Sequence, residues 1–378
     1  MFDQLVVGAA PGDAITANAL LVQSVLRELG PSEVYANFIE PGVDHIVRPL
    51  SELHDRPNAA RPLIFHASIG CWPVPQALLD SGTRIALIYH NFSPSEAFAR
   101  YAPEVADDLI RGRWELERLR DRVVLAIAVS EFNARELVEL GFTDVHVVPP
   151  TPDIDRLDRI TPDPTMLQRI TDWGDGPLVL SVAQWLPHKR VERVLAAAAV
   201  LQQEYLPNAR LAVVGVERFP EYAQALRAFS RTVGLNVPQF VGRVSNAELA
   251  ALYLRARAFL TLSEHEGFCV PVVEAMALGV PVVASARAAI PDTVGDAGVL
   301  VDDPDDPVLV AGVLHHVLTD STARHVMIGR GVSRARQLSA RRSLPAMVDL
   351  ILTMLDESPA PVGATAGGTQ GGARGGAQ

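Results

Sequence analysis

Short apolar runs alternate with longer amphipathic segments along most of the chain. This alternation is typical of β–α–β units, in which helices cover a sheet of parallel strands. The predicted strands of the first half are Leu5–Gly8, Val34–Phe38, Leu63–Ala67, Ile85–Tyr89, Val123–Val129 and Val145–Val148. The predicted helices between them are Ala14–Leu29, Ser95–Leu119 and Glu131–Leu140. The first half therefore predicts one parallel α/β sheet.

The pattern breaks at 149–153 and then starts again. Prolines at positions 149, 150 and 152 exclude regular structure there, because proline lacks the amide proton and has a fixed φ. The predicted strands after the break are Leu178–Val182, Leu211–Gly215, Gln239–Val241, Ala258–Leu262, Val280–Ala284 and Val299–Val301. The predicted helices are Arg190–Glu204, Glu221–Val233, Asn246–Arg255, Pro271–Leu278, Pro307–Leu318, Thr322–Gln337 and Leu344–Met354.

A chain of 378 residues suits two domains better than one. Open parallel sheets bind ligands beyond the carboxyl ends of their strands. We therefore predict two Rossmann-like, doubly wound α/β domains that face a cleft. The predicted boundaries are a first domain at 1–152, a linker at 153–176, a second domain at 177–340, a helix at 341–357 and a tail at 358–378. The tail is rich in Gly, Ala and Pro, a composition typical of disorder.

Composition narrows the class of protein. The net charge of −11 argues against nucleic-acid binding, which needs a basic surface. The two cysteines make neither a disulfide framework nor a zinc-binding pattern. The chain shows no basic start of a signal peptide and no apolar run long enough to span a bilayer. We expect a cytoplasmic protein, either free or on a membrane surface.

The stretch from Ser263 to Ala284 carries the strongest chemical signal. It indicates a strand end, a glycine loop, a short helix that begins near Pro271, and a second strand. The unpaired amides at the start of such a helix attract anionic oxygens. Glu266 lies before the helix and Glu274 inside it, and carboxylates accept hydrogen bonds from hydroxyls. Together these groups suit a nucleotide-sugar, although an ordinary strand–loop–helix with surface acids is the alternative.

Lys189 is the one lysine of the chain, among 33 lysines and arginines. It follows the predicted strand Leu178–Val182, where it would face the same cleft. An ammonium group is a compact charge with three donors and suits a crowded phosphate. Chance placement in an arginine-biased composition is the alternative interpretation.

These segments resemble the family-four retaining nucleotide-sugar glycosyltransferases, which have two Rossmann-like domains (the GT-B fold). Glu266 and Glu274 resemble the paired glutamates of that family, and the run from Gln184 to Lys189 resembles its phosphate motif. The run 241–245 resembles its loop beside the base, and 290–301 a block further along. The fold implied includes a C-terminal helix that crosses back toward the first domain.

The resemblance implies a hexose transfer without a metal or another cofactor, from a GDP- or UDP-linked sugar to a carbohydrate, lipid-linked or small-molecule acceptor. The second domain would bind the donor and the first the acceptor. Glu274 would hold the ribose, and Glu266 would contact the transferred sugar. The donor would also contact a set of loop residues: Gly267, Phe268, Cys269 and Val270. Lys189 would neutralise the departing diphosphate.

The chain departs from the family pattern in three places: Pro-Pro-Thr at 149–151 replaces Pro-Asn-Gly, Ala183 replaces a glycine, and the third departure matters most. Gln184 stands where the family usually has an arginine, so Lys189 would carry more of the charge stabilisation. Arg190 or Arg243 would compensate for the missing guanidinium. The departure at Gln184 also motivates a second hypothesis, a nucleotide-sugar-binding protein without turnover. A nucleotide-sugar epimerase on the same fold is a third.

The first half offers weaker signals. Gly12 and Asp13 follow the first strand and precede a helix, so Gly12 is a candidate for donor contact and Asp13 for acceptor contact; a plain turn is the alternative. His66 and His90 each end a predicted strand. Either imidazole could bond a sugar hydroxyl or serve only as a structural group. The resemblance favours His90 as a catalytic residue that faces the donor sugar.

Residues 111–122 combine five arginines with Trp114 and two leucines. A basic helix with an apolar stripe can rest on an anionic membrane. Three acids in the same segment favour a solvated helix that packs on its own sheet. We therefore expect the helix to be solvated, with peripheral membrane contact as the alternative.

Overall fold

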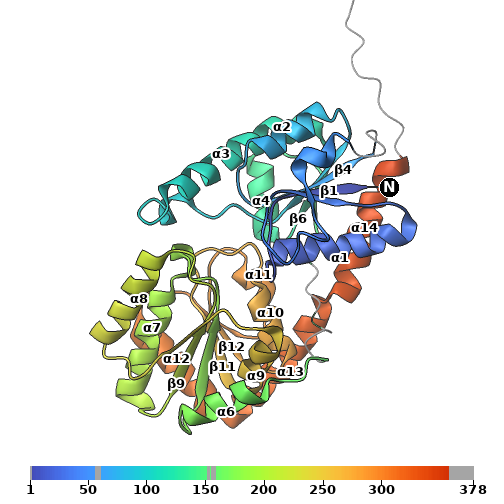
Figure 1. Ribbon diagram of the computed structural model, residues 1–378. Helices are drawn as coiled ribbons and strands as arrows, with labels where there is room; N and C mark the ends of the chain where they lie inside the picture. The colour runs from blue at the N-terminus through green and yellow to red at the C-terminus, as the bar shows by residue number, and fades with distance from the viewer. Residues whose placement is uncertain (1, 56–60, 151–153, 155–158, 357–378) are drawn as a thin grey trace, which may run out of the picture.

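The computed structural model describes every residue except 1, 56–60, 151–153, 155–158 and 357–378. The predicted disordered tail lies outside the described residues. The chain forms two α/β units, which are the upper and lower halves of Figure 1. Every predicted strand is present, with its ends shifted by at most two residues. The prediction of two parallel-sheet domains is therefore confirmed.

The first sheet has seven parallel strands in the order β3-β2-β1-β4-β5-β6-β7. Its strands are β1 Asp3–Ala9, β2 Val34–Ile39, β3 Arg48–Pro49, β4 Leu63–Ala67, β5 Ile85–Tyr89, β6 Val123–Ala128 and β7 Val145–Val147. The short strand β3 is not evident in the apolar pattern, because it begins with an arginine and a proline. The strand order reverses between β1 and β4, where doubly wound sheets bind ligands.

The second sheet has six parallel strands in the order β10-β9-β8-β11-β12-β13. Its strands are β8 Leu178–Val182, β9 Arg210–Val214, β10 Gln239–Gly242, β11 Ala256–Thr261, β12 Val282–Ser285 and β13 Val299–Val301. The order reverses between β8 and β11. The loops that follow these two strands therefore meet at the switch point of the sheet.

The helices of the first unit are α1 Ala14–Leu29, α2 Pro73–Asp80, α3 Pro103–Leu119 and α4 Glu131–Glu139, with the single turns η1 Leu50–Leu53, η2 Ser95–Ala97 and η3 Arg120–Arg122. The sequence predicted one helix at 95–119, but the structure has the turn η2 and then α3. The cause is Pro103, which favours the first turn of a helix and disfavours its interior. Helix α2 was not predicted.

The helices of the second unit are α6 Pro164–Asp172, α7 Val191–Val200, α8 Pro220–Thr232, α9 Asn246–Arg255, α10 Val270–Ala277, α11 Ile290–Val294, α12 Pro307–Thr319, α13 Ser321–Gln337 and α14 Ala340–Asp356. A single turn, η4 Pro187–Lys189, precedes α7, and a π-helical segment, η5 Leu201–Tyr205, continues it. Helix α6 lies inside the segment predicted as a linker. It packs against α9, and Asp163 caps it by accepting from the Met166 amide at 2.6 Å.

Helix α14 joins the two units. It runs from the lower unit to the upper one in Figure 1, where it contacts α1 and β6. Its side chains Met347 and Ile351 are fully buried and belong to one apolar cluster with Val22 of α1 and Ile127 of β6. The same cluster includes Val272 of α10 in the second unit. A continuous core therefore runs through both units, and the C-terminal helix crosses back as expected.

We predict that Ile351→Ala lowers the free energy of unfolding by about 2–5 kcal/mol, because it leaves a cavity between the units. Asp349→Ala is the matched control, since Asp349 lies on the exposed side of the same helix. It should change stability by no more than about 0.5 kcal/mol. Urea-induced unfolding measures both. Equal effects of the two substitutions would contradict the role given to α14.

Candidate functional site

The carboxyl ends of the two sheets face each other, and hydrogen bonds connect the two units there. The Phe132 amide, in the first turn of α4, donates to Oδ2 of Asp292 in α11 at 3.0 Å. The imidazole Nε2 of His265 bonds Oδ1 of Asn91, which follows β5. The amide of Asn91 donates to Asn133 at 3.0 Å, so its oxygen faces His265. His265 therefore donates the bond.

Gly267 permits this approach. A Cβ atom at position 267 would lie 2.4 Å from the backbone oxygen of His90 and 2.8 Å from Cβ of Asn91. Both distances are shorter than any normal contact of a Cβ atom. The loop after β11 therefore touches the loop after β5 only because residue 267 has no side chain.

Lys189 and Glu266 form an ion pair in this region. The ammonium Nζ lies 2.6 Å from Oε2 of Glu266, and the side chains are 17% and 10% exposed. Lys189 lies in the turn after β8, and Glu266 in the loop after β11. Both residues therefore follow strands, as the sequence predicted, and the strand order places the pair at the switch point of the second sheet.

Helix α10 begins beside this pair. Cys269 precedes it with φ of 74°, and Pro271 lies in its first turn. No hydrogen bond of the described residues uses the amides of Gly267, Phe268, Cys269 or Val270. The carbonyl of Phe268, by contrast, accepts from the Thr293 hydroxyl. The loop thus engages the Phe268 carbonyl in a hydrogen bond and leaves the four amides without a partner among the described residues. Unpaired amides at the start of a helix suit an anion.

Glu274, in the first half of α10, is oriented by a buried phenol. Tyr253 of α9 donates to Oε2 of Glu274 at 3.0 Å. Burial, and then the nearby Glu274 carboxylate, raises the pKa of Tyr253 well above its ordinary value of 10.0, so the phenol remains a donor. Tyr253 was not predicted, because in the sequence it is one of the apolar positions of a helix.

The neighbouring arginines differ in availability. Arg193 is buried and pairs with Asp305 at 2.6 Å and with Glu264 at 2.6 Å. Arg190 pairs with Glu192 at 3.1 Å. Arg243, directly after β10, is exposed and makes no hydrogen bond or ion pair with the described residues. Of the two arginines predicted to compensate for Gln184, Arg243 is therefore the available one.

Gln184 follows β8 and is partly exposed, with no side-chain hydrogen bond to the described part of the chain. Gly12 has φ of 77°, and a Cβ there would meet nothing within 4 Å. Asp13 caps α1, because its Oδ2 accepts from the amide and hydroxyl of Thr16 at 2.8 and 2.9 Å. Gly12 therefore remains open to a ligand, whereas Oδ2 of Asp13 is occupied.

His66 does not reach the cleft. It is fully buried, and its ring nitrogens bond His90 at 3.0 Å and Gln4 at 2.9 Å. The hypothesis that His66 bonds an acceptor therefore fails for lack of access. His90 is partly exposed at the end of β5 and faces the Gly267 loop through its backbone oxygen.

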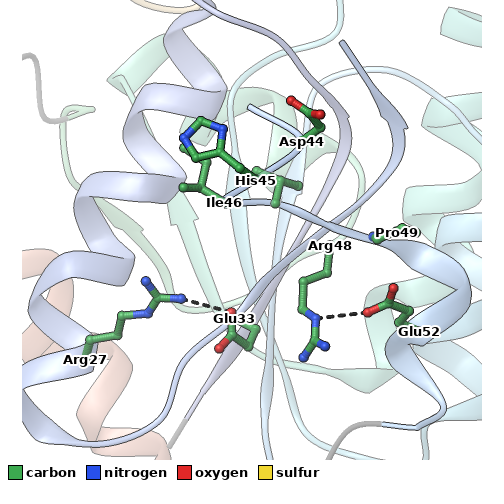
Figure 2. A pocket seen from close by; sticks show the side chains of 9 residues that line it. Arg27, Glu33, Asp44, His45, Ile46, Arg48, Pro49 and Glu52 are labelled. Atoms are coloured by element: carbon green, nitrogen blue, oxygen red, sulfur yellow. Dashed lines mark hydrogen bonds and ion pairs between the residues drawn. The ribbon is translucent and has the colours of Figure 1, made fainter. Parts of the chain in front are cut away.

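A shallow hollow on the first unit is separate from this site. Figure 2 shows its lining, in which Arg27 and Arg48 reach Glu33 and Glu52 at 2.9 and 3.0 Å. Glu33 directly precedes β2 and Arg48 begins β3, so the hollow lies at the amino ends of the strands. Ligands of open parallel sheets bind at the opposite edge.

Residues 164–334 match the protein family described as Glycosyl transferases group 1. This segment includes Gln184, Lys189, Glu266 and Glu274. The second unit of the chain is therefore similar to group 1 glycosyl transferases over this segment. The matched segment contains the ion pair, the free amides of α10 and the switch point of the second sheet.

Curated relatives of the chain carry glycosyltransferase names. It is 29% identical over 225 residues to O-antigen chain mannosyltransferase B of Escherichia coli, covering 58% of each chain. It is 28% identical over 278 residues to GDP-mannose-dependent alpha-mannosyltransferase of Mycobacterium tuberculosis, covering 72% of this chain and 66% of that protein. The chain thus spans little more than half of the first of these relatives.

The two units of the chain share their arrangement with solved structures. Sucrose-phosphate synthase from Thermosynechococcus elongatus superposes with a TM-score of 0.75 at 17% identity, over 94% of this chain and 99% of that one. At this identity the likeness concerns the fold, which is the two-domain GT-B arrangement.

Among the described residues, no helix is long and apolar enough to cross a membrane, and no cluster of three His, Cys, Asp or Glu side chains could hold a metal.

We predict that Gly267→Ala separates the two units at the cleft, because the new methyl group would overlap the His90 carbonyl. The Phe132 amide, which is bonded to Asp292 across the cleft, should then exchange with solvent at least about tenfold faster. Hydrogen exchange measures this directly. Gly329→Ala is the control, since a Cβ there would meet nothing within 4 Å. Unchanged protection at Phe132 in Gly267→Ala would show that the contact does not limit closure.

Proposed function

We propose that this protein is a retaining glycosyltransferase that moves a hexose from a nucleotide diphospho-sugar to a hydroxyl acceptor without a metal. The ion pair of Lys189 and Glu266 beside the free amides of α10 carries the proposal. A cation and several amide donors converge at the switch point of the second sheet, within the segment similar to group 1 glycosyl transferases. A diphosphate is the part of a nucleotide-sugar that such a set of donors binds.

Each group of the site has a defined task in this mechanism. The α10 amides and Lys189 receive the diphosphate, and Arg243 adds charge from the end of β10. Glu274, oriented by Tyr253, accepts hydrogen bonds from the ribose hydroxyls. Glu266 holds Lys189 in place, and we assign to its carboxylate the contact with the transferred sugar.

The chemical step needs stabilisation of a departing nucleoside diphosphate. Donors that are fixed before the reaction stabilise the developing charge without reorganisation. The anomeric carbon–oxygen bond to the diphosphate breaks, and the acceptor oxygen forms a new bond on the same face. The leaving phosphate oxygen takes the acceptor proton. No covalent enzyme intermediate is formed, so trapping a glycosyl-enzyme would contradict this part of the proposal.

The names of the relatives support a donor class. Two of them are called mannosyltransferases, and one is called GDP-mannose-dependent. We propose GDP-mannose as the first donor to test, with UDP-glucose as the comparison. The acceptor is proposed only as a carbohydrate, lipid-linked or small-molecule hydroxyl.

Turnover of the donor distinguishes the proposal from its alternatives. Wild-type protein should release GDP slowly from GDP-mannose, and Lys189→Ala should lower this rate by about two to three orders of magnitude, as expected for loss of a fixed charge. Arg231→Ala, at an exposed position of α8, is the control and should leave the rate unchanged. Tight binding without release under any acceptor would favour a binding protein instead. Conversion to another nucleotide-sugar would favour an epimerase.

Peripheral membrane contact is a further part of the proposal. Trp72 and Trp114 stack at 6.2 Å and are 39% and 50% exposed, beside the exposed Ile110. Arg118 lies over both indoles. Exposed aromatic and basic side chains together favour an anionic interface.

We predict that the protein sediments with vesicles that contain phosphatidylglycerol and that Trp114→Ala lowers the bound fraction severalfold. Leu254→Ala, which removes an exposed apolar side chain from α9, is the matched control and should bind as wild type does. Sedimentation that is equal for all three proteins, or absent for wild type, would leave the aromatic pair as an ordinary surface feature.

A further inference from the structure

A chain of buried polar groups ends at His90, where the first unit contacts the Gly267 loop of the second. Gln4 of β1 is fully buried, and its Nε2 donates to the backbone oxygen of Ala19 in α1 at 3.0 Å. Its Oε1 lies 2.9 Å from Nε2 of His66, at the end of β4. Nδ1 of His66 lies 3.0 Å from Nε2 of His90, and the planes of the two rings differ by only 15°, as suits an in-plane N–H···N bond. This chain of hydrogen bonds therefore connects the Ala19 carbonyl of α1 to His90.

The direction of each bond follows from the one before it. A carbonyl only accepts, so the amide nitrogen of Gln4 faces Ala19 and its oxygen faces His66. That oxygen also only accepts, so Nε2 of His66 carries a proton. In a neutral imidazole the other nitrogen is then an acceptor, so Nδ1 of His66 accepts from Nε2 of His90. By the same rule, Nδ1 of His90 carries no proton.

Both rings are neutral near pH 7. Burial, and then the neighbouring His90, lowers the pKa of His66 well below its ordinary value of 6.5. Burial lowers the pKa of His90 to about 4. Protonation therefore does not scramble the bond directions over the physiological range.

Nδ1 of His90 is the free end of the chain. It makes no hydrogen bond with the part of the protein that the structure describes, and it is not one of the fully buried unpaired polar atoms of these residues. The backbone of the same residue touches the Gly267 loop, next to Glu266. A lone pair is therefore available beside the loop that carries part of the proposed donor site.

We propose that Gln4 and His66 are positioning residues, which fix His90 as the tautomer protonated on Nε2 so that Nδ1 accepts a hydrogen bond from a sugar hydroxyl. The inference rests on the proposed function for the nature of the ligand. The assignment of the tautomer rests only on the geometry of the hydrogen bonds that link Gln4, His66 and His90. A histidine fixed in this way selects a ligand group that donates a hydrogen bond, because its Nδ1 accepts from a hydroxyl and has no proton to donate.

The test compares His66→Leu with His66→Asn. Leucine removes the acceptor for Nε2 of His90, and a buried N–H without a partner is unfavourable. The proton should then move to Nδ1. Asparagine places an oxygen near the former Nδ1 and should keep the wild-type tautomer. Nitrogen-15 NMR of labelled histidine at pH 7 reads the tautomer without any need for activity.

Kinetics with GDP-mannose provides the second readout. His66→Leu should lower kcat/KM for donor hydrolysis by about tenfold or more, and His66→Asn should stay within about threefold of wild type. A loss already seen in hydrolysis assigns the hydroxyl to the donor sugar, and a loss confined to transfer assigns it to the acceptor. The affinity for GDP, which lacks the hexose, should be equal in both variants and wild type.

Three outcomes would overturn the inference: a proton on Nδ1 of His90 in the wild-type protein, equal kinetics in His66→Leu and wild type, or equal losses in the leucine and asparagine variants. The last would mean that His66 has only a structural role. Absence of turnover in wild-type protein, together with the expected tautomer, would instead refute the proposed function and keep the assignment of the chain of bonds.

Discussion

The site depends on the contact between Gly267 of the second unit and His90 of the first. The loops after β11 and β5 approach so closely that a Cβ atom on residue 267 would lie 2.4 Å from a backbone oxygen. Around this contact, the amide of Phe132 bonds Asp292, and helix α14 ties the two units through one apolar core. Because the two units meet through backbone contact, the groups on either side of this contact are held at distances set by the sheets and not by flexible side chains.

Two arginines near the site are already paired with carboxylates, which leaves Lys189 as the cation proposed to bind the diphosphate. Arg193 is held by Asp305 and Glu264, and Arg190 by Glu192, so both guanidinium groups stabilise the loops around the site. Lys189 remains, paired with a single carboxylate, in a chain with a net charge of −11. An ammonium that has one partner and two further protons can take up phosphate oxygens without breaking a structural network. This division explains how a domain with Gln184 in place of an arginine retains a cation where the diphosphate is proposed to bind.

The polar chain from Gln4 to His90 shows a different use of burial. In a core, each polar group must have a hydrogen-bond partner of the opposite kind, because an unpaired polar group is unfavourable there. That requirement transmits the direction of one bond to the next over three side chains. Burial thereby determines which nitrogen of His90 carries the proton, although Gln4 does not contact His90 directly.

The sequence by itself determined the alternation of strands and helices, the parallel sheets, and the position of Lys189, Glu266 and Glu274 after strands of the second sheet. These follow from local rules, because apolar periodicity and proline or glycine breaks act over a few residues. The tertiary structure decided the rest. It placed Tyr253 on Glu274, turned His66 into the core, gave Oδ2 of Asp13 to a helix cap and formed α6 in the predicted linker. Such pairings depend on which segments, distant along the chain, share a buried surface, and no single stretch of residues carries that information.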